Sequence, residues 1–103
     1  MPPERKSQPR TPELAAYARA IQGRMDELGL HQKALADASK IDIRRVGDYV
    51  RGQHGPSMAN TRKLCAALGL SVDEFFTRVS EQEEALKREA AAAGATAGAS
   101  QRR

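Results

Sequence analysis

One stretch of 22 residues, His31–Gly52 (HQKALADASKIDIRRVGDYVRG), constrains the fold of this chain more than any other. Its apolar spacing predicts two short helices, from about Gln32 to Ser39 and from about Ile43 to Arg51. Residues 40–42 are left to form a tight turn between them. Such a pair can cross at a steep angle only when small side chains allow close approach, as the residues at positions 36 and 39 do.

The second helix of this pair is expected to have two different faces. Asp42 is well placed to cap it by accepting hydrogen bonds from its first free amides. Val46 and Tyr49 are predicted to point inward. The outward positions are Arg44, Arg45, Gly47 and Asp48. This polar and mostly basic face is typical of a helix that reads DNA.

Composition favours an all-α fold in one domain. The chain has 103 residues, no Trp and 4% aromatic residues, so Leu, Ala, Val, Ile and Met must form the core. Residues 1–70 hold 12 Lys/Arg against 7 Asp/Glu, and residues 71–103 hold 5 against 6. The basic excess therefore accompanies the helix pair, as a phosphate-binding surface requires, although a merely basic protein would show it too.

The chain divides into a leader, a helical domain and an extension. Residues 1–10, rich in proline and basic residues, are predicted to be either a disordered leader or a basic arm that contacts DNA. Residues 11–78 are predicted to form five helices, with Thr11, Ser57 and Ser71 as further N-caps and with Gly29 and Gly69 as helix ends. The predicted inward positions outside the central pair are Leu14, Ala18, Ile21, Met25, Leu28, Met58, Thr61, Leu64, Cys65, Leu68, Val72, Phe75 and Phe76.

The extension covers residues 79–103 and is predicted to be partly helical. Ser80-Glu81-Gln82-Glu83 offers a new capping box, and Val79, Leu86 and Ala93 lie seven residues apart. So narrow an Ala-rich stripe is marginal as an isolated helix. From Gly94 to the end, GATAGASQRR is expected to be disordered.

Several short motifs occur together in order over about Leu14 to Phe76. They are Gly29-Leu30, Gln32, Leu35-Ala36, Ile41, Val46, Tyr49, Arg51-Gly52, Pro56-Ser57, Leu64, Ala67-Leu68-Gly69 and Asp73-Glu74-Phe75. In this pattern the chain resembles the lambda-repressor/Cro-type helix-turn-helix family, also called the xenobiotic-response-element type. The resemblance implies a compact five-helix domain, usually dimeric, with its third helix in the DNA major groove. It also implies transcriptional control, most often repression.

The chain departs from the family pattern at two positions. The family usually has Gly in the turn, where this chain has Lys40, and a left-handed conformation costs a residue with a side chain roughly 1–2 kcal/mol. Gly47 lies inside the recognition helix, where it costs roughly 0.5–1 kcal/mol relative to Ala. Its benefit is either a closer approach of the helix backbone to the bases or nothing at all.

Base readout is expected from the outward face of the second helix. Arg44 is the first candidate, because a guanidinium there can bond guanine O6 and N7 together. Arg45 lies about 100° further round the helix and reaches either a base or a phosphate. Asp48 either accepts from cytosine N4 or orients Arg44. Ile43 either contacts a thymine methyl group or lies at the edge of the core, and Gly47 completes this set.

Phosphate contacts are expected around the same helix pair. Gln32 starts the first helix, where amides and an amide side chain can meet a phosphate. In the family, the loop after the recognition helix and the exposed side of the next helix contact the DNA backbone. The alternative for each residue in these two places is an ordinary solvated surface position. The expected phosphate-contacting residues are Gln32, Lys33, Arg51, Gln53, His54, Asn60, Arg62 and Lys63.

Other functions find little support in the sequence. It contains no Gly-rich phosphate loop and no Ser/His/Asp or Cys/His set, so we expect no enzyme and no cofactor. His31 and His54 lack a ligand pattern, so no metal site is expected, and the one cysteine, Cys65, is predicted to lie in the core. No segment is apolar enough to span a membrane and the first ten residues are not a secretory signal, so a cytoplasmic location is expected.

The leading hypothesis is a homodimeric, sequence-specific DNA-binding repressor from a bacterium or phage. An alternative is a protein-interaction module, such as an antitoxin whose residues 79–93 bind a partner. The two are compatible, because one protein can bind both DNA and a partner. A third hypothesis, a degenerate domain that binds only protein, fits poorly with the outward basic residues Arg44, Arg45 and Arg51.

Overall fold

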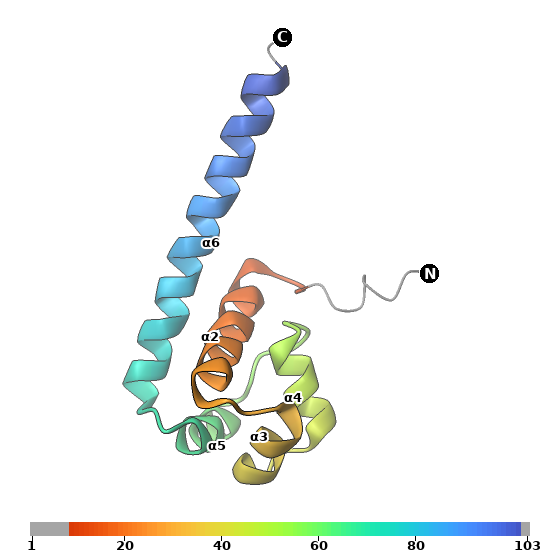
Figure 1. The fold of residues 1–103 in the computed structure, drawn as a ribbon, viewed down its shortest axis with the longest axis vertical. Helices are drawn as coiled ribbons and strands as arrows, with labels where there is room; N and C mark the ends of the chain where they lie inside the picture. The colour runs from red at the N-terminus through yellow and green to blue at the C-terminus, as the bar shows by residue number, and fades with distance from the viewer. Residues whose placement is uncertain (1–8, 102–103) are drawn as a thin grey trace.

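The computed structural model describes residues 9–101, and describes side chains as far as residue 93. Within that range the chain forms five helices and no strand (Figure 1). They are α2 (Pro12–Leu28), α3 (Gln32–Ser39), α4 (Ile43–Val50), α5 (Met58–Leu68) and α6 (Val72–Gln101). The predicted all-α architecture of five helices is confirmed, and the helix pair of the central stretch is α3 and α4.

The expected N-caps hold the starts of four helices. Each cap side chain accepts a hydrogen bond from an amide in the first turn, which stabilises an end that the helix itself leaves unbonded. The four bonds are Leu14 N to Thr11 Oγ1 at 3.1 Å, Arg44 N to Asp42 Oδ1 at 2.8 Å, Asn60 N to Ser57 Oγ at 3.1 Å, and Glu74 N to Ser71 Oγ at 3.0 Å. In α6 the Glu74 carboxylate also accepts from Ser71 N at 2.9 Å, which completes the predicted capping box.

Three helices end on a residue in the left-handed conformation. Gly29 closes α2 with φ 67° and Gly69 closes α5 with φ 68°, as the sequence predicted. Lys40 closes α3 with φ 59°, and it is the one residue with a side chain that takes a positive φ among those described. Lys40 therefore takes the left-handed conformation at the position where the family usually has Gly.

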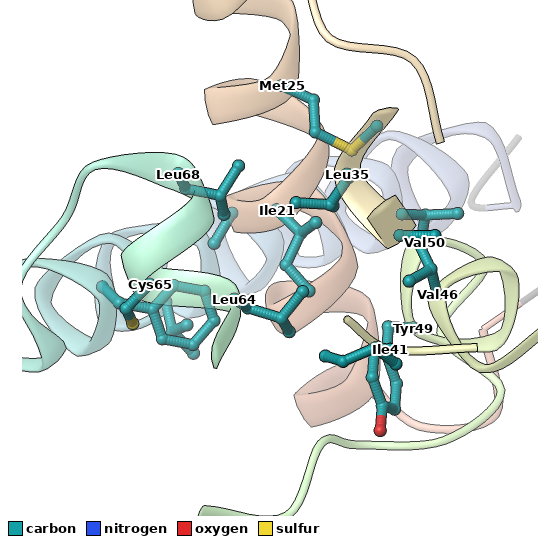
Figure 2. Packing of buried hydrophobic residues seen from close by; sticks show 14 of the residues in the cluster. Ile21, Met25, Leu35, Ile41, Val46, Tyr49, Val50, Leu64, Cys65 and Leu68 are labelled. Carbon is teal, nitrogen blue, oxygen red and sulfur yellow. The ribbon is translucent and has the colours of Figure 1, made fainter. Parts of the chain in front are cut away.

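A single apolar core joins all five helices. Figure 2 shows Ile21 of α2 between the α5 residues Leu64 and Leu68 on one side and the α4 residues Val46 and Val50 on the other. Phe75 from α6 and Leu35 from α3 are completely buried in the same cluster. Because α3 and α4 share this core with α2 and α5, the helix pair is held as part of a rigid body.

Two predicted core residues are wrong. Leu28 is 43% exposed and Met58 is 52% exposed. Leu28 is the last residue of α2 and Met58 is the first of α5, so both lie beyond the part of the helix that faces the core. Conversely, Ala16 and Ala20 of α2 were not predicted to face the core, and they are 0% and 4% exposed.

The C-terminal region is one helix of 30 residues rather than a short helix followed by a separate extension. The predicted new start at Ser80 is wrong, because Val79 is buried and Leu86 packs on the core, which keeps the helix in register across this point. The helical backbone continues through Gln101, where disorder was expected from Gly94 onward. Alanine has the highest helix propensity of any residue, and it dominates this stretch.

Helix α2 lies between α6 and the helix pair (Figure 1). On its α6 side, Arg19 makes two 2.8 Å bonds with the Glu89 carboxylate, and Glu27 accepts from both Arg24 and Arg78 at 3.0 and 3.1 Å. On its other side, α2 contacts α4. The two sides of α2 therefore separate an ion-paired surface from the candidate functional one.

Candidate DNA interface

The turn between α3 and α4 is fixed by apolar packing and by local hydrogen bonds. Leu35 of α3 and Val46 of α4 are both fully buried. The buried Ser39 hydroxyl donates to the carbonyl oxygen of Leu35 at 2.7 Å, so this polar group carries no penalty for burial. The amide of Ile41 donates to the carbonyl oxygen of Ala36 at 3.2 Å, which closes the end of α3. The angle between the two helices is thus set by the core rather than by their exposed residues.

Two polar contacts that the sequence analysis missed hold the carbonyl end of α4. The Gln22 amide nitrogen donates to the Val50 carbonyl oxygen at 2.7 Å, and the Asn60 amide nitrogen donates to the Tyr49 hydroxyl at 2.8 Å. Gln22 and Asn60 lie on α2 and α5, so α4 is fastened from both sides. Neither contact has a local sequence signal, because each joins residues at least 11 positions apart.

The first turn of α4 presents its side chains outward. Arg44 and Arg45 are exposed, and Ile43 is 48% exposed. The expected alternative of Ile43 at the edge of the core is therefore wrong, because its side chain lies at the open start of the helix. A hollow of about 420 Å³ at this point is lined by Lys33, Ala36 and Asp37 of α3, by Ile41 and Asp42 of the turn, and by Ile43. The structure thus brings a predicted phosphate contact and a predicted base contact next to each other.

Apart from Arg51, the cations of this face have no acidic partner within the described side chains. No ion pair or side-chain hydrogen bond engages Lys33, Arg44 or Arg45 among residues 9–93. Arg62 and Lys63, on the exposed side of α5, are also without a described partner. Unpaired cations on one protein face raise the positive potential there and attract polyanions.

The start of α3 differs from the start of every other helix in the described chain. His31 stands at its N-cap but makes no side-chain cap bond. The first-turn amides of α3 therefore keep their hydrogen-bonding capacity, and a helix start of this kind favours a phosphate oxygen. Gln32 and Lys33, both predicted phosphate contacts, are exposed in this first turn.

Asp48 and Gly47 do not have the surroundings expected from the sequence. The Asp48 carboxylate accepts from Arg51 Nη2 at 3.1 Å, so its described partner is Arg51 rather than Arg44. The Arg51 side chain also covers Gly47, which is buried. The expected outward position of Gly47, open to the bases, is wrong because this guanidinium occupies the space that a side chain would have filled.

The remaining predicted phosphate contacts lie around the end of α4 and the start of α5. Arg51 and His54 are exposed, and Gln53 is half-buried, with its amide nitrogen 3.5 Å from the Arg51 carbonyl oxygen. Asn60 is half-buried because its amide bonds Tyr49. The amide of Arg10 donates to the Gly52 carbonyl oxygen at 3.0 Å, so the leader enters the fold beside the end of α4. Residues 1–8 of the predicted arm lie outside the described residues.

Three further observations bear on functions other than DNA binding. No cluster of His, Cys, Asp and Glu among the described residues has the arrangement of a metal site. Cys65 is buried, as predicted, and its burial raises the pKa of the thiol, which disfavours the reactive thiolate. None of the described helices has the length and apolarity needed to cross a membrane.

In α3 and α4, two short helices joined by a tight turn are held by a shared core, and the second helix has an outward basic face. This is the arrangement of a helix-turn-helix DNA-binding domain. The family model described as Helix-turn-helix matches residues 21–75, more than half of the chain. The chain therefore belongs to the helix-turn-helix family of the Cro/C1 type, whose members bind double-stranded DNA. The resemblance seen in the sequence is confirmed.

Solved structures agree with this family. The chain is similar to the restriction-modification controller protein C.AhdI from Aeromonas hydrophila, with 32% identity and a TM-score of 0.58 over 60% of this chain and 94% of that one. It is also similar to the clp gene regulator ClgR from Corynebacterium glutamicum, with 20% identity and a TM-score of 0.75 over 81% of this chain and 88% of that one. The likeness to ClgR shows the fold alone. No curated protein matches the chain.

Proposed function

We propose that this protein is a sequence-specific regulator of transcription that binds double-stranded DNA, and that it acts as a repressor. One observation carries the proposal: the outward first turn of α4 holds Arg44 and Arg45 with no described partner, beside the uncapped start of α3. A helix start that favours phosphate next to a helix with exposed arginines is the arrangement in which helix-turn-helix domains bind the DNA backbone beside the major groove. The controller protein C.AhdI, which shares 32% identity with this chain, supports a regulatory role.

In this proposal α4 enters the major groove and its first turn reads bases. Arg44 donates to guanine, Arg45 reads a neighbouring base or binds a phosphate, and the exposed Ile43 contacts a thymine methyl group. Residues around α4 hold the DNA backbone. Base contacts specify the sequence, and phosphate contacts fix the orientation of the protein on the duplex. We assign the phosphate contacts to Gln32, Lys33, Arg51, Gln53, His54, Asn60, Arg62 and Lys63.

The protein is proposed to bind as a homodimer, as members of this family often do. Two copies related by a two-fold axis would read two half-sites about 34 Å apart, one turn of B-DNA. The operator would then be a near-palindrome. A protein with this function works in the cytoplasm, associated with the nucleoid, without a cofactor and without catalytic activity.

Selection of bound sequences from a pool of random duplex DNA tests the proposal. The expected result is enrichment of a short palindromic sequence whose half-sites have the spacing given above. The mass of the complex in solution provides a second check, and it should correspond to two chains on one duplex. Recovery of random sequences alone would contradict sequence-specific regulation.

A second candidate function is binding of a protein partner through residues 79–93, as in an antitoxin. The observation that favours it is a mostly apolar hollow of about 330 Å³ between the start of α2 and the middle of α6. It is lined by Pro12, Leu86 and Ala90 together with Glu13, Glu83 and Lys87. Leu86→Glu would place a charge in this hollow. The partner function predicts that this variant loses the partner while it still binds DNA; retention of the partner would exclude this surface.

A further inference from the structure

The surroundings of Gly47 explain a residue that is unfavourable inside a helix. A β-carbon added at Gly47 would lie 2.8 Å from Nη1 and 3.3 Å from Nη2 of Arg51, and 3.4 Å from its Cζ. Contacts under 3.0 Å force something to move. The Arg51 guanidinium therefore lies over the bare backbone of Gly47, in a place that the side chain of any other residue at this position would occupy.

Asp48 holds the same guanidinium from the side. Its Oδ1 atom accepts from Arg51 Nη2 at 3.1 Å, while the Arg51 amide donates to the Gly47 carbonyl oxygen at 3.1 Å. The two side chains are 41% and 30% exposed for Arg51 and Asp48, so the pair lies at the surface of the proposed DNA-binding face. A guanidinium has five N–H donors, and among the described residues only one of them is engaged.

We infer that Gly47, Asp48 and Arg51 form one unit that seats the Arg51 guanidinium for a DNA phosphate before DNA arrives. Gly47 provides the space, Asp48 fixes the rotation of the guanidinium plane, and the remaining N–H groups are available to the phosphate. Asp48 and Gly47 are then positioning residues rather than readers of a base. Holding a flexible side chain in its bound position reduces the entropy lost on binding, which is how the unit increases affinity. This inference rests on the proposed function.

Three roles of Asp48 are distinguished by the sign or the pattern of their effects on DNA affinity. A carboxylate that only repels phosphate would increase affinity when neutralised. A carboxylate that accepts from cytosine N4 would lose preference at one base pair when replaced. The positioning role predicts that neutralisation lowers affinity by the same factor for every sequence.

The first experiment is a double-mutant cycle of Asp48→Asn and Arg51→Ala, with dissociation constants measured on the duplex selected from the random pool and on a duplex of unrelated sequence. Arg51→Ala should weaken binding to both duplexes by about tenfold and flatten the salt dependence by about one unit. Asp48→Asn should also weaken binding, and the factor should be the same for the selected duplex and for the unrelated duplex. In the Arg51→Ala background, Asp48→Asn should have no further effect. Asp48→Asn combined with Lys63→Ala, a cation of α5 outside the unit, should be additive.

The second experiment places Gly47→Ala in the wild-type and Arg51→Ala backgrounds. In the wild type it should raise the thermal midpoint, because Ala favours a helix, and yet weaken DNA binding by about as much as Arg51→Ala does. In the Arg51→Ala background it should leave binding unchanged. If Gly47 instead let the helix backbone approach the bases, Gly47→Ala would weaken binding equally in both backgrounds.

The outcomes separate the inference from the function on which it rests. If the wild-type chain binds no DNA, the proposed function fails, and the inference fails with it. If the wild type binds but the Asp48 and Arg51 effects are additive, only the inference is overturned. Increased affinity on neutralising Asp48, or a loss of preference at one base pair, would overturn it in the same way.

Discussion

The two sides of α2 differ in how many of their neighbouring arginines are paired with a carboxylate. On the side of α6, Arg19 pairs with Glu89, and Arg24 and Arg78 share Glu27, at distances of 2.8 to 3.1 Å. On the side of the helix pair, Arg44 and Arg45 have no described partner, although the opposite face of their helix is buried in the core. With 13 Asp and Glu against 17 Lys and Arg, the chain cannot pair every cation. On the side of the helix pair, the ion pair among the described side chains is the one between Asp48 and Arg51.

This difference distinguishes a structural surface from a binding surface. Ion pairs between exposed groups stabilise a fold only slightly, so the contacts on the α6 side mainly fix how α6 lies along α2. Unpaired cations gain nothing within the fold and repel one another. Their positive potential becomes favourable only when an anion binds, which is why we place the DNA on this side.

The largest effect we predict separates these two kinds of arginine. Arg44→Ala should weaken binding to the selected duplex by about 1–3 kcal/mol and abolish the preference at one base pair, since a bidentate contact to guanine is lost. The matched control is Arg19→Ala, which removes the same charge from the ion-paired side. It should leave the sequence preference unchanged in the same titration. Equal losses from both variants would mean that net charge, rather than position, governs binding.

The ends of the helices provide the next contrast. Lys40 adopts φ 59° at the end of α3, where Gly29 and Gly69 hold the same conformation for α2 and α5. Lys40→Gly should therefore increase the free energy of unfolding by about 1 kcal/mol, as measured by denaturant titration.

Lys40→Ala is the matched control for that substitution. It removes the charge but keeps the β-carbon that opposes a positive φ, so the gain in stability should be absent. A similar gain from both variants would attribute the effect to charge repulsion at the turn rather than to backbone strain.

A smaller effect is expected at Gly23, on the opposite side of the molecule. Nothing lies within 4 Å of a β-carbon added there, in contrast to Gly47, where Arg51 fills the space. Gly23→Ala should raise the free energy of unfolding by roughly 0.5–1 kcal/mol and leave DNA affinity unchanged. Gly23 lines a surface hollow between α2 and α6, so an added methyl group has room there. A loss of stability in Gly23→Ala would contradict this prediction.

Much of this fold was predictable because it follows from local rules. The caps at Thr11, Asp42, Ser57 and Ser71 and the ends at Gly29 and Gly69 each depend on residues a few positions apart, and all are confirmed. The break expected at Ser80 failed because a capping motif is only a local preference. Val79 is buried and Leu86 packs on the core, and this packing continues the helix through the motif.

The candidate site was predictable in its location but not in its contacts. The outward positions of Arg44 and Arg45 follow from the helical spacing of Val46 and Tyr49, which are buried as predicted. The pairing of Asp48 with Arg51 rather than Arg44 was not predictable, because both arginines lie within about one turn of the carboxylate. Rotamers and the space over Gly47 decide between them, and neither is visible in the residue order.

The smallest effect tests whether the ion-paired side contributes to stability through its ionised carboxylates. Hydrogen bonds from Arg78 and Arg24 hold the pKa of Glu27 below its ordinary value of 4.5. A carboxylate with a lowered pKa in the folded state stabilises the fold above its unfolded pKa, and this contribution disappears as the pH falls through the folded pKa. Glu27→Gln should therefore lower the thermal midpoint slightly at pH 7, and the difference from wild type should shrink as the pH falls below about 4.5.

Glu81→Gln is the matched control, because Glu81 lies in the same region and makes no ion pair among the described side chains. It removes an equal charge but no described contact, so its midpoint should stay close to that of the wild type at pH 7. If the lower thermal midpoint of Glu27→Gln were unchanged at acidic pH, the shape of the glutamate side chain, and not its charge, would support the junction of α2 and α6. The contrast between the two sides of α2 would then rest on the unpaired cations of the helix pair alone.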